Sequence, residues 1–327
     1  MRQMSLSRSI VPWLVGGSLL LGGSTSAQTQ TDWPRAKPVN ILVGFGPGAF
    51  TDVIARVVAQ RLGEATGGSF VVENRPGAGG NIATGQVKRA APDGYTILVH
   101  SVAYAVNPSL YANAGYDALK DFAPLALGPR TPNILTVHPN TPAKDLKELV
   151  ELARKDKLSY ASSGIGTTTH LSMERLKMAA KVDITHVPYQ PAQAISAVVA
   201  GHAPMSSTSM PPAVPQIKAG KLRAIAVTSA KRNALLPDVP SVTEFGYTDF
   251  DDYTWVGFFL PAGTPPALVE RINAEINKAM EHPESKERFV SLGMESTRNT
   301  PAEFGVFLRG EVDKWAGVVR STGAKAE

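Results

Sequence analysis

The chain has 327 residues, of which 43% are hydrophobic, and this suffices for one large domain or for two lobes of ordinary size. It contains no cysteine, which excludes disulfides, thiolate metal sites and a cysteine nucleophile. The formal net charge of +5 at pH 7 is small and no basic run accompanies it, so the composition does not indicate a nucleic-acid partner.

Residues 1–27 have the layout of a secretory signal peptide. Arg2 and Arg8 supply a positive start, residues 10–21 are largely apolar, and small residues follow up to Ala27. The apolar stretch is too short and too interrupted for a stable membrane span. We therefore predict cleavage near Ala27 and export of the mature chain.

The first part of the mature chain alternates short apolar segments with helical patterns. Residues 39–43 read as a buried strand, and residues 52–62 carry apolar side chains at helical spacing. Further strands are expected at residues 70–73 and 96–99. This alternation predicts an α/β fold with a largely parallel sheet.

A second α/β unit is expected over residues 131–253, with strands at 134–137, 184–187 and 222–227. An apolar strand at 254–260 follows. No low-complexity linker separates the units, so two lobes joined by crossing strands fit better than two separate domains. We assign residues 28–130 and 254–327 to lobe 1 and residues 131–253 to lobe 2.

Helix starts are marked by threonine–proline pairs, in which a capping hydroxyl precedes a proline suited to the first helical turn. These pairs are Thr141-Pro142, Thr264-Pro265 and Thr300-Pro301. The last pair is also followed by Glu303 at the spacing of a capping box.

The strongest local feature is the glycine-rich turn over residues 44–52, Gly-Phe-Gly-Pro-Gly-Ala-Phe-Thr-Asp, between the first strand and the first helix. Its glycines let the backbone bend and approach a ligand, and the helix N-terminus that follows offers unpaired N–H groups. Together they make an anion site, although a tight turn without a ligand would look the same. Thr51 and Asp52 are expected to cap the helix.

A second loop repeats this logic in the other lobe. Residues 162–170, Ser-Ser-Gly-Ile-Gly-Thr-Thr-Thr-His, precede another helical pattern and add hydroxyl donors to the backbone N–H groups. Two such loops, one in each lobe, predict a ligand whose carboxylate oxygens are held between them. His170 is expected to satisfy nearby backbone groups rather than to bind the ligand.

An NAD-dependent oxidoreductase is the alternative. Gly44, Gly46 and Ala49 match G-x-G-x-x-A between a strand and a helix, and Glu73 ends the next strand. Pro47 inside the turn, the long spacing to Glu73 and the export signal count against it.

The histidines lack zinc-binding spacings and there is no G-x-S-x-G elbow, so we expect no catalytic residue, no metal and no cofactor.

Several longer segments carry a resemblance to the Bug family, the periplasmic receptors of tripartite tricarboxylate transporters, over nearly the whole mature chain. These segments are residues 71–80, 92–96, 107–111, 186–189, 220–224, 236–240 and 261–265. The resemblance implies a two-lobed Venus-flytrap fold of the type II periplasmic class, with a ligand cleft between the lobes. It also implies a small organic carboxylate as ligand and membrane transporter subunits as partners; a monomer is expected. A sensor subunit for a membrane kinase would share this fold.

The resemblance also implies where the ligand lies. The first turn contributes Phe45, Gly48, Ala49, Phe50 and Thr51, and the second loop contributes Ser162, Gly166, Thr167 and Thr168. Ser101, Ala103 and Tyr189 are further candidates by their positions in the family pattern.

The sequence departs from that pattern in ways that affect the ligand. Gly44 and Ala49 stand where the family usually has proline and glycine, and Ala49 tolerates a positive φ less well, so a different loop path is expected. Thr208 stands near the place of a cleft aspartate, whose loss removes a counter-charge for an amine. We therefore expect an aromatic or dicarboxylic acid without an amino group, with Phe45 or Phe50 available for stacking.

Overall fold

The computed structural model describes Met1 and residues 32–326, and the predicted signal peptide lies, beyond Met1, outside the described residues. The N-terminal half of the first lobe contains these elements: β1 (Val39–Val43), α2 (Phe50–Thr66), β2 (Phe70–Asn74), the short η1 (Ala78–Gly80), α3 (Asn81–Lys88), β3 (Thr96–Ser101) and α4 (Ala103–Leu110).

The long strand β4 (Phe122–Val137) leads into the second lobe. There the elements are α5 (Leu146–Lys155), β5 (Leu158–Ser162), α6 (Thr168–Ala180), β6 (Ile184–Pro188), α7 (Pro191–Val199), β7 (Met205–Ser209), α8 (Met210–Lys218), β8 (Arg223–Val227) and the short η2 (Val242–Phe245). The chain returns through β9 (Tyr253–Pro261) and ends with α9 (Pro266–Glu281), α10 (Pro283–Ser291) and α11 (Pro301–Thr322).

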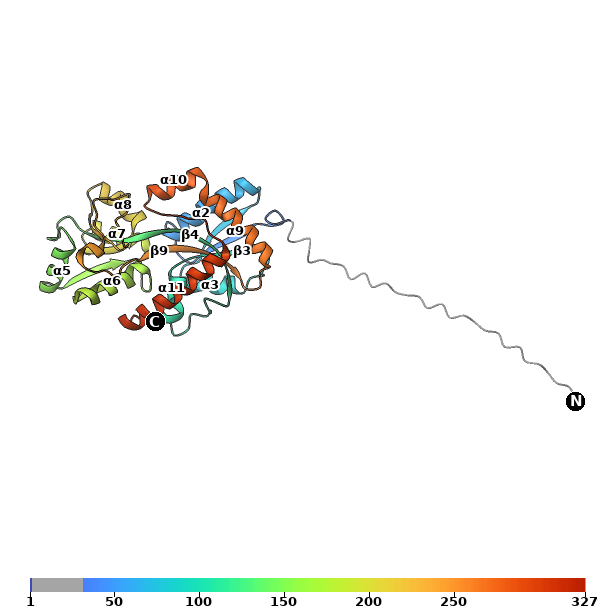
Figure 1. The fold of residues 1–327 in the computed structure, drawn as a ribbon, viewed down its shortest axis with the longest axis horizontal. Coiled ribbons are helices and arrows are strands. Elements are labelled where there is room, and N and C mark those ends of the chain that lie inside the picture. The colour runs from blue at the N-terminus through green and yellow to red at the C-terminus, as the bar shows by residue number, and fades with distance from the viewer. Residues whose placement is uncertain (2–31, 327) are drawn as a thin grey trace.

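The strands form one continuous sheet in the order β2-β1-β3-β9-β4-β7-β5-β6, with β8 paired to β4. β1 is parallel to β2 and β3, as the strand–helix alternation predicts. β9 is antiparallel to β3 and to β4, and β4 is also antiparallel to β7 and β8. In Figure 1, β4 and β9 run through the middle, with α5 to α8 at one end and α2, α3 and α9 towards the other. The α/β fold is therefore confirmed, but the expected largely parallel sheet is wrong: the sheet is mixed, because the crossing strands β4 and β9 pair antiparallel with each of their neighbours.

Each end of the sheet has its own apolar core. Two buried clusters draw on residues 33–126 and 255–319, with Leu171 of α6 as an additional member. Two others draw on residues 134–250. This arrangement gives two lobes with the crossing strands between them, while the proposed boundaries at 130/131 and 253/254 stay predictions.

The helix starts follow local capping chemistry, but not at every predicted place. Thr300 and Glu303 form the predicted capping box of α11. The expected start at Thr141 is wrong, because α5 begins at Leu146 with Asp145 as its cap, and the Asp145 side chain accepts the backbone N–H of Glu148. Ala49, rather than Thr51 or Asp52, occupies the N-cap position of α2.

Candidate ligand-binding cleft

A cavity of about 230 Å³ lies between the lobes, where the N-terminal ends of three helices meet. α2 belongs to lobe 1, whereas α6 and α8 belong to lobe 2. The lining residues are Phe45, Gly48, Ala49, Phe50, Thr51, Val53, Ser101, Ser163, Thr167, Thr168, Thr169, Ser209, Pro211, Pro212, Thr254, Arg288, Leu292 and Met294.

The turn between β1 and α2 is shaped by close backbone approach. A Cβ atom on Gly44 would lie 3.0 Å from the Cα of Gly80 and 3.1 Å from the His100 ring, so a larger residue has little room. Gly48 has a φ of 78°, which favours glycine. Ala49 has a φ of −64° and a ψ of 158°, so this alanine does not need a positive φ, and the different loop path stays a prediction.

Asp52 stabilises this turn on the side away from the cavity. Its carboxylate accepts the backbone N–H of Gly48 at 2.9 Å, the Asn74 amide at 2.9 Å and the Arg56 guanidinium at 3.0 Å. Burial is the largest single influence on its pKa and acts to raise it, but the hydrogen bonds from Arg56, Gly48 and Asn74 together lower the pKa below its usual value. Asp52 is therefore an ionised structural group and does not line the cavity.

Thr51 differs from its neighbour because its hydroxyl has no internal partner. The residue is 2% exposed, it lines the cavity, and its Oγ1 makes no hydrogen bond to any described residue. The N–H groups of the first turn of α2 likewise have no partner within the helix. A buried polar group normally has a partner, so these donors indicate a place for an anionic ligand atom.

The loop between β5 and α6 presents hydroxyls from the opposite lobe. Thr167 caps α6 by accepting the backbone N–H of His170, and its own hydroxyl donates to the Gly164 carbonyl at 2.7 Å. Thr168 is hydrogen-bonded to Thr254 of β9, whose hydroxyl donates to Asn133 of β4 at 2.8 Å. This chain of side chains connects the cavity wall to both crossing strands.

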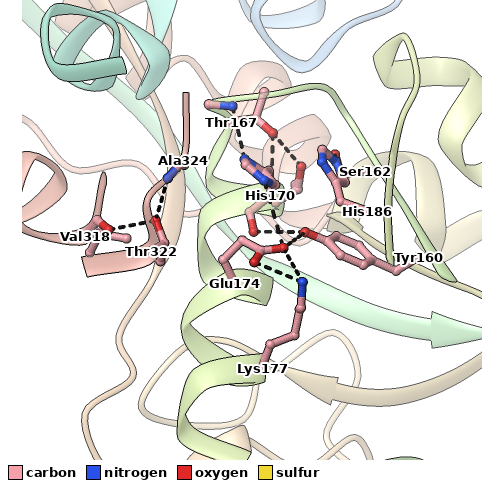
Figure 2. Close-up of polar contacts among 12 residues, drawn as sticks. Tyr160, Ser162, Thr167, His170, Glu174, Lys177, His186, Val318, Thr322 and Ala324 are labelled. Carbon is pink, nitrogen blue, oxygen red and sulfur yellow. Dashed lines mark hydrogen bonds and ion pairs between the residues drawn. The ribbon is translucent and has the colours of Figure 1, made fainter. Parts of the chain in front are cut away.

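Two stacked histidines support this loop from below (Figure 2). The ring centroids of His170 and His186 are 4.1 Å apart, the Gly166 N–H donates to His170 Nδ1, and a hydrogen bond of 2.6 Å joins Ser162 Oγ to His186 Nε2. Burial lowers the pKa of His170 to about 4 and that of His186 to about 3, so both are neutral at pH 7. Neither lines a cavity, and both support the backbone, as expected for His170.

The predicted residues fall into three groups. Eight line the cavity: Phe45, Gly48, Ala49, Phe50, Thr51, Ser101, Thr167 and Thr168. Ala103 and Tyr189 line an adjoining cavity of about 440 Å³, which shares Phe45, Ser163 and Thr167 with the first. Ser162, Gly166 and Thr208 line neither; Gly166 packs against Leu110, and the fully buried Thr208 hydroxyl has no partner among the described residues. A ligand role for these thirteen residues stays a prediction.

Beyond the two predicted loops and the helices they begin, sequence reasoning missed three parts of the wall, one of which is Thr254 of β9. Ser209, Pro211 and Pro212 start α8, and a serine followed by prolines was a readable helix-start signal. Arg288, Leu292 and Met294 come from α10 and the segment after it, where no local motif distinguishes them from an ordinary amphipathic helix. Among the residues that line the cavity, Arg288 carries the one charged side chain.

Within residues 32–326, no helix combines the length and the hydropathy needed to cross a membrane. The same part of the chain holds no group of three His, Cys, Asp or Glu side chains placed to bind a metal ion. The chemistry on offer is a set of hydrogen-bond donors from two lobes around a largely apolar space, which suits reversible binding of an anionic small molecule.

Comparison with known proteins agrees with this geometry. Residues 54–324 match the family described as the tripartite tricarboxylate transporter family receptor. The chain is 33% identical to BugT of Bordetella pertussis strain Tohama I over 314 residues, which are 94% of this chain and 96% of BugT.

Two solved structures are similar over most of the chain. One is an R. palustris protein with adipate, at 32% identity and a TM-score of 0.85, covering 90% of this chain and 99% of that one. The other is MatC from Rhodopseudomonas palustris with bound malate, at 31% identity and a TM-score of 0.81, covering 87% and 99%.

Proposed function

This chain belongs to the tripartite tricarboxylate transporter receptor family, and we propose that it is a periplasmic receptor that binds a small organic carboxylate and delivers it to the membrane subunits of such a transporter. The resemblance to the Bug family and the two-lobed periplasmic-binding-protein fold, both expected from the sequence, are confirmed.

One observation carries the proposal: donors from both lobes converge on one cavity. α2 brings the hydroxyl of Thr51, which has no partner among the described residues, from lobe 1. The start of α6 brings its backbone N–H groups from lobe 2, because the Thr167 and Thr168 hydroxyls donate within the protein. Helix N-termini attract anions through their free N–H groups and the helix dipole. Adipate and malate, which accompany two similar structures, are carboxylates of the expected size class.

The walls of the cavity narrow the ligand class. No Asp or Glu is among the lining residues, so the described site has no counter-charge for an ammonium group. Phe45, Phe50 and Leu292 supply apolar surface beside the donors. We therefore assign an aliphatic or aromatic carboxylate without an amino group, and we keep Phe45 or Phe50 as the stacking candidates for an aromatic ligand.

Binding requires no covalent step. The ligand is held first on one lobe, and closure adds the donors of the other lobe. Only the closed form makes both sets of contacts, so the ligand shifts the equilibrium towards closure. The transporter then recognises the closed surface of a monomeric receptor; a membrane sensor kinase as the recipient is the alternative.

A ligand screen on the leader-free protein tests this function. We expect a set of mono- and dicarboxylates to include acids that raise the Tm in a thermal-shift assay, while the amides of the same acids and NAD do not. Calorimetric titration of the best acid then gives Kd, with no turnover. Failure of every carboxylate, or stabilisation by NAD instead, would contradict the proposal and favour the dinucleotide interpretation of the turn at Gly44.

A further inference from the structure

α10 forms part of the rim of the cleft and is firmly attached there. Figure 1 shows it at the top of the molecule, between the lobes and near α8. Its Phe289 is 1% exposed in the core of lobe 1, while the segment after it is held by the crossing strand: the Thr131 hydroxyl donates to the Gly293 carbonyl at 2.9 Å. Arg130 and Glu295 exchange two backbone hydrogen bonds of 2.8 Å. The cavity-lining side chains of α10 and of the segment after it are therefore held on a fixed backbone.

The guanidinium of Arg288 has no partner in the part of the chain that the structure describes. Among the described residues, none forms an ion pair or a hydrogen bond with it, although the same helix supplies Glu284, which pairs with Arg61. An arginine that contributes only to solubility can lie anywhere on the surface, but Arg288 lines the cavity. Its five N–H donors are thus available to a ligand.

The wall formed by the starts of α2 and α6 differs in chemistry from the wall formed by Arg288, Leu292 and Met294. The starts of α2 and α6 supply neutral donors, including the buried Thr51 hydroxyl that lacks a partner. Leu292 and Met294 accompany Arg288 and are apolar. A ligand that satisfies both walls carries one anionic group for the helix starts, an apolar middle, and a second anionic group for the guanidinium. A planar guanidinium is suited to a carboxylate, which it binds through two parallel hydrogen bonds.

We propose that Arg288 is the residue that determines specificity for a second carboxylate, so that the receptor selects dicarboxylates over the corresponding monocarboxylates. This inference rests on the proposed carboxylate receptor function and adds the residue that recognises the far end of the ligand. Arg288 is exposed in this structure. Its contribution to ligand affinity therefore grows when closure removes water from around the guanidinium and the ligand carboxylate.

Two matched pairs of acids test the inference: adipate with hexanoate, and terephthalate with benzoate. We expect the wild-type protein to bind the dicarboxylate of at least one pair about ten-fold more tightly than its partner, a factor that corresponds to about 1.4 kcal/mol. Arg288→Gln should remove that preference by weakening dicarboxylate binding, with less than a two-fold change for the monocarboxylate. Arg288→Lys keeps the charge but not the paired hydrogen bonds, and should fall between the two.

Lys286→Gln is the control, because Lys286 is an exposed cation on the same helix that does not line the cavity. It should leave all four affinities unchanged. Equal weakening of both acids of a pair in Arg288→Gln, an unchanged preference in that variant, or a wild-type protein that prefers monocarboxylates would overturn the inference while the receptor function stands. Absence of binding by every carboxylate in the wider screen would overturn both.

Discussion

Arg175 and Asp252 form a buried ion pair at the junction of the lobes. Arg175 Nη1 of α6 lies 2.6 and 2.7 Å from the two carboxylate oxygens of Asp252, which immediately precedes β9 and is fully buried. Lys314 of α11 approaches the same carboxylate at 2.9 Å. One carboxylate therefore joins a helix of lobe 2, a crossing strand and the C-terminal helix of lobe 1.

Asp252→Asn should destabilise the protein strongly. Removing the negative charge leaves two cations beside a buried amide, and breaking a buried pair typically costs about 3 kcal/mol or more. Urea unfolding should show a lower midpoint. Asp249→Asn is the control, because Asp249 also pairs with Arg175 but is fully exposed, and it should leave the midpoint nearly unchanged. Equal effects of the two substitutions would contradict this account.

Thr51→Val should separate binding from stability. The Thr51 hydroxyl is buried and has no partner among the described residues, so its removal should leave the free energy of unfolding unchanged or raise it by about 1 kcal/mol. Carboxylate affinity should fall about ten-fold or more, as measured by calorimetric titration. Thr84→Val is the opposite control, because the Thr84 hydroxyl donates to the Gly80 carbonyl at 3.0 Å. This variant should have a lower free energy of unfolding and an unchanged affinity for the carboxylate. Unchanged affinity in Thr51→Val would remove Thr51 from the site.

Gly166→Ala should weaken binding through contact between the lobes. Gly166 has a φ of 75°, and an added Cβ would lie 2.2 Å from Leu110 Cδ2 on α4 of lobe 1. Gly201→Ala shares the backbone strain at a φ of 74° but meets no neighbour within 4 Å. Both variants should lose roughly 1 kcal/mol of stability. Gly166→Ala alone should bind ligand at least ten-fold more weakly, and similar affinities in the two variants would disprove the contact effect.

Acid should destabilise the protein through the two stacked histidines beneath the second loop, His170 and His186. The pKa values of His170 and His186 are lowered by burial to about 4 and about 3, whereas the unfolded chain takes up these protons near pH 6.5. The unfolded state therefore binds more protons below pH 6.5, and stability falls as the pH drops from about 6.5 towards 4. His170, which is buried, contributes about 2 kcal/mol of this loss between pH 7 and 5, and the partly exposed His186 contributes less because solvent screens it.

The histidine effect can be measured from urea unfolding at several pH values. His186→Gln should flatten the dependence on pH even if its stability at pH 7 is lower than that of the wild type. His202→Gln removes an exposed histidine and should leave the slope unchanged. A slope that is the same in all three proteins would assign the acid sensitivity to other groups.

The sequence predicts the parts of the cleft that carry a local signal. The glycine-rich turn before α2 and the hydroxyl-rich loop before α6 are visible because turn chemistry and helix capping depend on neighbouring residues. Arg288 lies far along the chain, and its place in the cleft depends on how α10 packs. Only the tertiary structure reveals that neighbourhood.

The full length of β4 could not be predicted from the sequence either, because local signals argue against a strand over its first part. The sequence predicts a strand at 134–137, but the structure extends it back to Phe122 through Pro124, Pro129 and Pro132. Proline removes a hydrogen-bond donor and argues against a central strand. Here register shifts between Pro124 and Ala126, and between Leu127 and Arg130, accommodate Pro124 and Pro129 within the pairing with β9, whereas Pro132 pairs with Tyr253 without a shift.

These register shifts have a mechanical consequence. Because β4 and β9 remain hydrogen-bonded to one another from Phe122 to Pro132, the lobes share a two-stranded ribbon and not a pair of loose tethers. Such a ribbon resists stretching and sliding but yields to twisting and bending where its ladder is interrupted. We therefore expect the two lobes to open and close by rotation about this ribbon, with little sliding of one lobe past the other.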